Sequence, residues 1–197
     1  MIGRLTGRLL LKQPPLLLID VGGVGYEVEA PMSTFYRLPA TGDSVTLLTH
    51  LTVREDAHLL FGFATVQEKS LFRELIKISG VGPKLALSVL SGMGPEEFWN
   101  TVRAGDVPRL TKLPGVGRKT AERLVVEMRD KAGADDAVAL PGGGTAAAAG
   151  SPLQEARSAL SALGYKPAEI QRYTEAVYKD GMSTEQIIQE ALRRAVR

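Results

Sequence analysis

Apolar and polar residues alternate in short runs along the first third of the chain. Residues 1–64 are rich in Val, Leu and Thr, and prolines and glycine pairs interrupt them. This pattern predicts short strands joined by turns. The predicted strands are 2–11, 16–21, 26–30, 44–53 and 57–63. A few short strands in a segment of this length are typical of a small closed barrel, so we predict an OB-fold.

The run GGVGYEV at 22–28 contains glycines that suit either a tight turn or a phosphate-binding loop. A phosphate-binding loop needs a helix to follow it, whereas strand-like segments lie on both sides of this run. We therefore predict a hairpin turn between two strands.

From Val66 onward the apolar residues recur at the spacing of helices. Pro83 and Pro95 suit the first turn of a helix, and Glu96 and Glu97 suit its positive end. The pattern predicts four successive helices whose apolar stripes form a core rather than a ligand site. The stripes are Leu71, Phe72, Leu75 and Ile76; Leu85, Ala86, Val89 and Leu90; Phe98, Trp99 and Val102; and Leu124, Val125 and Met128.

The stretch 132–151 has almost no large apolar residues, so it predicts a flexible linker. Helical spacing returns beyond it in three groups and predicts a small three-helix, UBA-like domain. Ser151 with Gln154, and Ser183 with Gln186, have the spacing of capping boxes. The expected class is a multidomain α+β protein, with a barrel at 1–64, a helical domain at 65–131, the linker at 132–151 and the small domain at 152–197.

Composition and charge exclude several kinds of chemistry. The chain has no cysteine, which rules out disulfides, thiol nucleophiles and iron–sulfur clusters. His50 and His58 are the only histidines, and we interpret both as polar strand residues rather than metal ligands. No apolar run is long enough to cross a membrane, so a soluble cytoplasmic protein is expected. The net charge is only +2, so any nucleic-acid site must come from clustered cations.

Two segments share one layout, ISGVGPKLA from Ile78 and LPGVGRKTA from Leu113, and they repeat at a step of 35 residues, from Gly80 to Gly115. Glycines permit a tight turn, and the start of the next helix presents free amide groups and a positive dipole end to an anion. Basic residues follow each turn. The candidate phosphate-binding residues are Ser79, Gly80, Val81, Gly82 and Lys84, then Gly115, Val116, Gly117, Arg118, Lys119, Thr120 and Arg123, with Arg54 from the barrel.

This layout resembles the helix-hairpin-helix family of DNA-binding motifs, which contact the DNA backbone without reading its sequence. It also resembles the hairpin of base-excision glycosylases, in which a lysine at the position of Lys119 attacks the sugar with help from an aspartate. The nearest acids, Asp135 and Asp136, lie in the expected linker, so we assign Lys119 a phosphate contact. No Walker A sequence is present, so any ATP must be used by a partner.

Glu55 and Asp56 fall at a predicted turn between two barrel strands, in VREDAHLLFGF. Together with the start MIGRLTG, both hairpins and the later GYKPAEI, this segment resembles the RuvA family of Holliday-junction-binding proteins along the whole chain. The resemblance implies a tetramer, or two tetramers face to face, that holds a four-way junction open. Glu55 and Asp56 would form an acidic pin at its centre.

The same resemblance implies that the last domain binds the hexameric ATPase RuvB, with the resolvase RuvC in the same complex. Leu163, Tyr165 and Ile188 are the candidate contacts, with a role in the domain core as the alternative. No catalytic residue, metal or cofactor is expected. Two other hypotheses stay open: an enzyme that uses Lys119 or a metal on Glu55 and Asp56, and a general helix-hairpin-helix module that binds any duplex.

Overall fold

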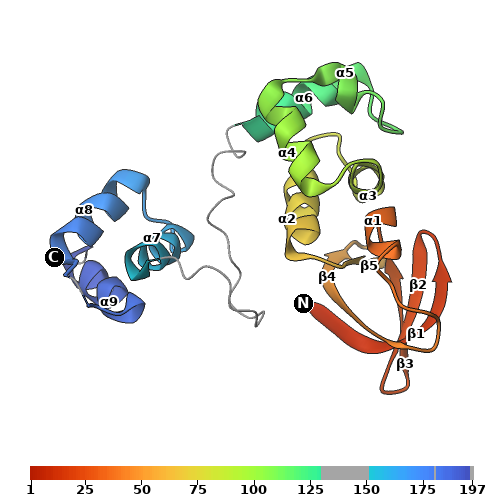
Figure 1. Cartoon of the computed structure of the whole chain (residues 1–197), viewed down its shortest axis with the longest axis horizontal. Helices are drawn as coiled ribbons and strands as arrows, with labels where there is room; N and C mark the ends of the chain where they lie inside the picture. Colours follow the sequence, from red (N-terminus) through yellow and green to blue (C-terminus); the bar gives the residue numbers. More distant parts are fainter. Residues whose placement is uncertain (130–150, 180, 196–197) are drawn as a thin grey trace. The chain divides into compact units, whose positions relative to one another are not determined.

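The computed structural model describes residues 1–129, 151–179 and 181–195, which form two compact units. One unit holds the barrel and the tandem hairpins, and the other holds the last three helices (Figure 1). The expected linker lies outside the described residues except for Ser151.

Five strands close into a barrel in the order β1-β2-β3-β5-β4, which confirms the predicted OB-fold. Neighbouring strands are antiparallel except for the β3–β5 pair, which is parallel. Val21 pairs with Val24, so GGVGYEV makes the predicted hairpin turn, with two residues between the strands. The strands are β1 (Arg4–Gln13), β2 (Leu16–Val21), β3 (Val24–Glu29), β4 (Ser44–Val53) and β5 (His58–Phe63).

Alternating side chains of the strands fill the barrel, as the period-two pattern requires. Leu9, Leu17 and Ile19 are fully buried there. A short helix that the sequence pattern did not predict, α1 (Met32–Phe35), lies between β3 and β4 and buries Phe35 in the same core.

In its described part, residues 65–129, the helical domain contains one helix more than the four predicted. It consists of α2 (Val66–Leu75), α3 (Pro83–Gly92), α4 (Pro95–Ala104), α5 (Val107–Leu110) and α6 (Arg118–Arg129). The helix that was missed, α5, has only four residues, which is too short to show a helical period. Residues 35 positions apart are buried in both copies of the repeat. Leu75 and Leu110 are one such pair, and Ala86 and Ala121 are another.

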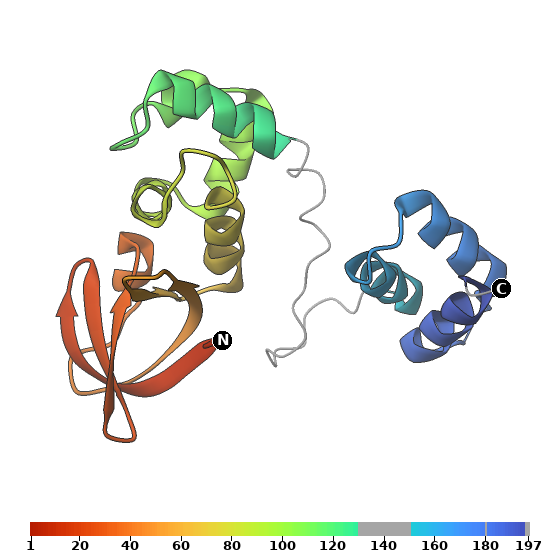
Figure 2. The ribbon, with the colours of Figure 1, turned by 180° about the vertical axis from the view of Figure 1, so that it is seen from behind.

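The core of the helical domain extends onto β5 of the barrel. Phe72 of α2 packs against Phe61 and Phe63 of β5, with ring centroids 5.0 and 4.9 Å apart. Buried Glu68 adds a polar link, because its carboxylate accepts hydrogen bonds from the Thr34 hydroxyl and the Thr65 amide. The hairpins are therefore fixed relative to the barrel, and Figure 2 shows α2 leaving the last strand directly.

The second unit is the predicted three-helix domain, made of α7 (Pro152–Ala162), α8 (Pro167–Val177) and α9 (Thr184–Ala195). Leu160, Ile170 and Ala191 form its core. Ser183 and Gln186 make the predicted capping box at α9. The matching prediction at Ser151 is wrong: its side chain makes no cap bond, and the Gln154 amide donates to the Ser151 carbonyl instead.

Candidate nucleic-acid interface

Each hairpin turn begins with a glycine in the left-handed backbone region, at φ +85° for Gly80 and +81° for Gly115. A residue with a Cβ rarely adopts this conformation. The next residue, Val81 or Val116, is buried in the core and anchors the turn. The second glycine, Gly82 or Gly117, then leads directly into a helix, α3 or α6.

Equivalent hydrogen bonds hold the two turns. The amide of Val81 donates to the Ile78 carbonyl at 3.0 Å, and the amide of Val116 donates to the Leu113 carbonyl at 3.1 Å. The first bond of each following helix runs from Ala86 to Gly82 and from Ala121 to Gly117, at 3.0 and 2.9 Å. The repeat in the sequence is therefore a repeat in geometry.

The exposed side of each turn carries free backbone donors. The first amides of a helix have no partner within that helix, and the helix dipole makes this end positive. Gly82 and Gly117, which precede α3 and α6, are both exposed, and Pro83 has no amide hydrogen to offer. Such an array of outward amides binds an anion.

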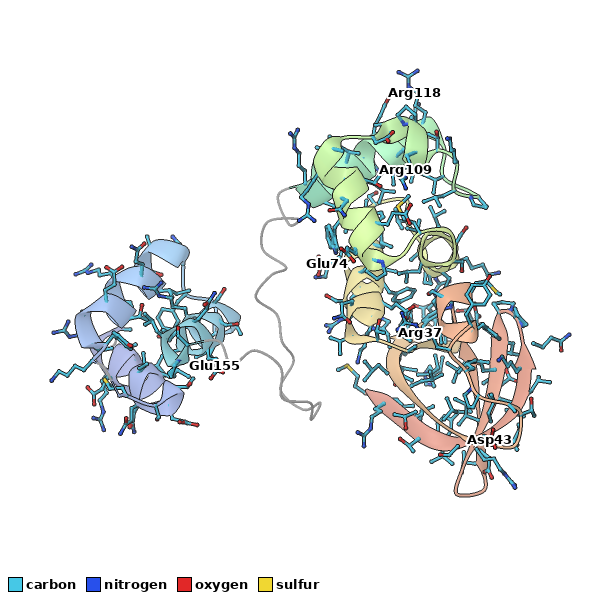
Figure 3. All side chains as sticks on the ribbon, in the orientation of Figure 1. Arg37, Asp43, Glu74, Arg109, Arg118 and Glu155 are labelled. Carbon is cyan, nitrogen blue, oxygen red and sulfur yellow. The ribbon has the colours of Figure 1, made fainter. Side chains whose placement is uncertain are left out.

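Basic side chains surround these amides. Lys84 and Lys119 are exposed at the starts of α3 and α6, and neither forms an ion pair with another described residue. Arg118 points away from the domain (Figure 3) and pairs with Glu122 at 2.9 Å, although its side chain remains 85% exposed. The arrangement offers each turn a positive surface suited to a phosphate group.

Arg123 has a partner within the protein. Its guanidinium donates to the Ser79 carbonyl at 2.7 Å, and it lies 3.7 Å from the Glu127 carboxylate. Ser88, which the sequence did not suggest as a site residue, donates from its hydroxyl to the Pro114 carbonyl at 2.8 Å. The 35-residue repeat could have pointed to Ser88, because it occupies the position of Arg123 in the other copy.

The acidic pair lies where the sequence placed it, in the turn between β4 and β5. Glu55 and Asp56 are exposed, and the Arg54 amide donates to the Ala57 carbonyl at 2.8 Å across the base of the turn. The turn thus presents two carboxylates and the Arg54 side chain to solvent on the unit that carries both hairpins.

Comparison with known proteins decides the family. The model described as "RuvA N terminal domain" matches residues 1–62, "SAM-like Helix-hairpin-helix tandem" matches 72–130, and "RuvA, C-terminal domain" matches 151–196. The chain is 58% identical to a protein of Thioalkalivibrio sulfidiphilus named Holliday junction branch migration complex subunit RuvA, with 98% of each chain covered. The chain belongs to the RuvA family.

Other relatives carry the same name and cover the same length. The RuvA of Vibrio parahaemolyticus is 54% identical over the whole of both chains. That of Shewanella frigidimarina is 53% identical over 98% of each. The family resemblance found in the sequence is therefore confirmed from end to end.

The three candidate residues of the RuvA C-terminal domain differ in exposure. Leu163 follows α7 and is 62% exposed. Tyr165 is partly buried, with its ring 6.3 Å from that of Tyr173 and perpendicular to it. Ile188 is also half-buried, on α9. Leu163 is thus the most accessible apolar side chain of the three.

The two histidines of this RuvA-family chain are strand residues, as predicted. His50 in β4 packs edge-on against Phe72, and burial together with nearby Arg73 and Lys69 lowers the pKa of its imidazole. His58 is exposed at the start of β5. Within the described residues, no three His, Asp or Glu side chains gather as a metal site would require.

Two further expectations from the sequence concern the acids near Lys119 and membrane-spanning segments. Asp135 and Asp136, the acids considered as helpers for Lys119, lie outside them. None of the helices that the structure describes is long and apolar enough to cross a membrane.

Proposed function

We propose that this RuvA-family protein binds four-way DNA junctions by shape and not by sequence, as the DNA-binding subunit of a branch-migration complex acting in recombination and repair. One observation carries the proposal: two geometrically equivalent turns, each followed by a lysine with no ion-pair partner among the described residues, lie on the same compact unit as an exposed acidic turn. The names of the relatives support it, since each is a Holliday junction branch migration complex subunit.

The hairpins supply affinity for the DNA backbone. Amides and lysines that contact phosphates bind any sequence, and such binding weakens as salt increases because counterions are released. The proposed interface comprises Ser79, Gly80, Val81, Gly82 and Lys84 in the first hairpin, Gly115, Val116, Gly117, Arg118, Lys119, Thr120 and Arg123 in the second, and Arg54 in the barrel.

A tetramer supplies the selectivity for shape. Four copies around a four-fold axis give one pair of hairpins to each arm of the junction, so the arms spread into an open square. A duplex can occupy only part of such a surface. Two tetramers that face each other across the DNA would enclose the junction in an octamer.

Glu55 and Asp56 act as a pin at the centre of the tetramer. Negative charge at the crossover repels phosphates, which disfavours an ordinary duplex at this point and helps to separate strands as they exchange partners. The hairpins hold the arms while the acidic turns keep the centre open.

The protein itself catalyses no reaction in this proposal and needs no cofactor. Residues 152–197 recruit the RuvB hexameric ATPase, which uses ATP to drive branch migration, and Leu163, Tyr165 and Ile188 are the proposed contacts. RuvC acts as a further partner on the same junction. The domain division at 1–64, 65–131 and 152–197 separates junction binding from motor recruitment.

A competition experiment tests the proposal. Purified full-length protein is bound to a labelled four-way junction in Mg²⁺ and moderate salt, then challenged with linear duplex of the same arm sequences. Excess duplex is expected to leave the junction bound. Equal competition would mean that the hairpins are general phosphate grips, and borohydride trapping on an abasic duplex would then test Lys119 as a nucleophile.

A further inference from the structure

Two side chains link the hairpins to each other in a reciprocal way. Arg123 of α6, in the second hairpin, donates to the Ser79 carbonyl of the first hairpin at 2.7 Å. Ser88 of α3, in the first hairpin, donates to the Pro114 carbonyl of the second at 2.8 Å. Donors and acceptors are both separated by the repeat step, 88 to 123 and 79 to 114. Each hairpin therefore donates a side-chain hydrogen bond to the equivalent backbone carbonyl of the other.

Each carbonyl that accepts one of these hydrogen bonds belongs to the residue immediately before the left-handed glycine of its turn. Ser79 and Gly80 share one planar peptide group, and in a trans peptide the carbonyl and the amide hydrogen point in opposite directions. A hydrogen bond that fixes the Ser79 carbonyl therefore also fixes the direction of the Gly80 amide. The same holds for Pro114 and the amide of Gly115.

These two amides have no acceptor among the residues that the structure describes. No hydrogen bond between described residues uses the amide of Gly80 or Gly115, and both glycines are exposed. The guanidinium of Arg123 lies close to Gly80, since a Cβ built there would be 3.8 Å from its Nη1 atom. Because hydrogen bonds in series polarise one another, a donor on the carbonyl also makes the amide of the same peptide a better donor.

We propose that Ser88 and Arg123 are positioning residues that aim the Gly115 and Gly80 amides at DNA phosphates, each acting across to the other hairpin. This inference rests on the proposed DNA-binding function and assigns Arg123 a brace rather than a direct phosphate contact. The two turns then form one rigid unit, in which the distance between the two phosphate-binding sites is fixed.

The salt dependence of junction binding separates a brace from a charge contact. We would measure the affinity of the full-length protein for a four-way junction over a range of salt concentrations. Arg123→Met and Ser88→Ala are expected to weaken binding by roughly 3- to 10-fold, which corresponds to the loss of one hydrogen bond. The slope of log affinity against log salt should stay unchanged for both variants.

Three further variants serve as comparisons for Arg123→Met and Ser88→Ala. Lys119→Met removes a cation that has no described ion-pair partner, so it should reduce the slope by about 0.9 for each phosphate that the protein no longer neutralises. Ser88→Thr keeps the hydroxyl donor and should bind normally. Arg123→Lys keeps the charge but loses the planar donor group, so it should not restore binding.

Amide hydrogen exchange gives a second readout that ordinary destabilisation would not produce. Arg123→Met, in the second hairpin, should speed exchange at Val81 in the first hairpin. Ser88→Ala, in the first hairpin, should speed exchange at Val116 in the second. Circular dichroism should show that both variants remain folded.

The outcomes distinguish this inference from the function on which it rests. If Arg123→Met reduces the salt slope as Lys119→Met does, and Arg123→Lys restores binding, Arg123 is a phosphate ligand and the brace is wrong. Faster exchange confined to the mutated hairpin would also overturn the brace. If Lys84→Met and Lys119→Met leave junction binding unchanged, the proposed function of the hairpins fails instead.

Discussion

At the scale of single residues, the two left-handed glycines define the hairpin turns. Gly80→Val or Gly115→Val is expected to cost roughly 1–3 kcal/mol of backbone strain, which a folded domain can tolerate while the turn changes shape. Gly115 should be the more sensitive position, because a Cβ there would lie 3.1 Å from the Leu85 side chain. Thermal melts should show folded protein, and gel shifts should show that DNA binding is abolished.

Gly94 provides the matched control for this prediction. It precedes α4 with φ −66°, and a Cβ there would meet open space. Gly94→Val should therefore keep both the fold and DNA binding. Normal binding by folded Gly80→Val would contradict the phosphate-hairpin account.

The acidic turn has the opposite expected effect on affinity. Glu55→Gln with Asp56→Asn removes two exposed negative charges without changing side-chain size. Because these charges repel phosphates, the affinity for junctions should stay equal or rise, and the preference for junctions over duplex should fall.

The competition gel shift measures this preference, and a strand-exchange assay with the motor present measures the change in branch migration. Asp43→Asn is the control, since Asp43 is also exposed in a turn of the barrel and should leave the preference unchanged. Loss of junction binding in the double variant would argue against a pin.

At the scale of elements, Glu68 of α2 connects the helical domain to the barrel by hydrogen bonds. Its carboxylate is buried and also accepts a hydrogen bond from the Ala64 amide at 3.0 Å. Glu68→Ala removes the acceptor of the buried Thr34 hydroxyl and of the part-buried Thr65 amide, which should lower the free energy of unfolding by about 1–3 kcal/mol. Glu68→Gln keeps an acceptor oxygen and should cost less.

Chemical denaturation of the full-length protein would measure this cost. Gln67→Ala is the matched control, because Gln67 is the exposed neighbour of Glu68 on α2. If Glu68→Ala were no less stable than Gln67→Ala, the polar link between the domains would contribute nothing measurable.

The regular elements were predictable because their apolar residues repeat. The limits of β2 and β4 match the predicted 16–21 and 44–53, and the other strands differ by one or two residues, β1 and β3 at both ends and β5 at its start. The short helices α1 and α5 were not predicted, since four residues do not complete a pattern. Alignment of the repeats would have shown α5 as the counterpart of the last turn of α2, where Leu110 matches Leu75.

The hairpin site was predictable in its backbone but not in its side-chain contacts. Gly80 and Gly115 were identified from the tight turn that their motif requires, and both have positive φ. The bonds of Arg123 and Ser88 depend on how the two copies pack together, which local sequence does not determine. The capping box at Ser151 failed for a local reason: the Gln154 amide donates to the Ser151 carbonyl, and the Ser151 side chain makes no cap bond.

At the scale of the whole molecule, the two compact units suggest separable functions. A protein lacking residues 152–197 keeps every residue of both hairpins and the acidic turn. It should bind junctions with unchanged affinity in gel shifts and fail to stimulate branch migration by the motor. Loss of junction binding in this deletion would refute the division of labour.

The reciprocal bonds between the hairpins have a consequence for how a DNA arm can lie on the protein. Contacts in which each of two similar parts meets the other in the same way are the mark of a two-fold axis. Duplex DNA has such axes of its own, perpendicular to the helix, and they exchange its two antiparallel strands. A module whose turns are related in this way offers one glycine turn to each strand of an arm, although Pro83 in one turn and Arg118 in the other make the two sets of donors unequal.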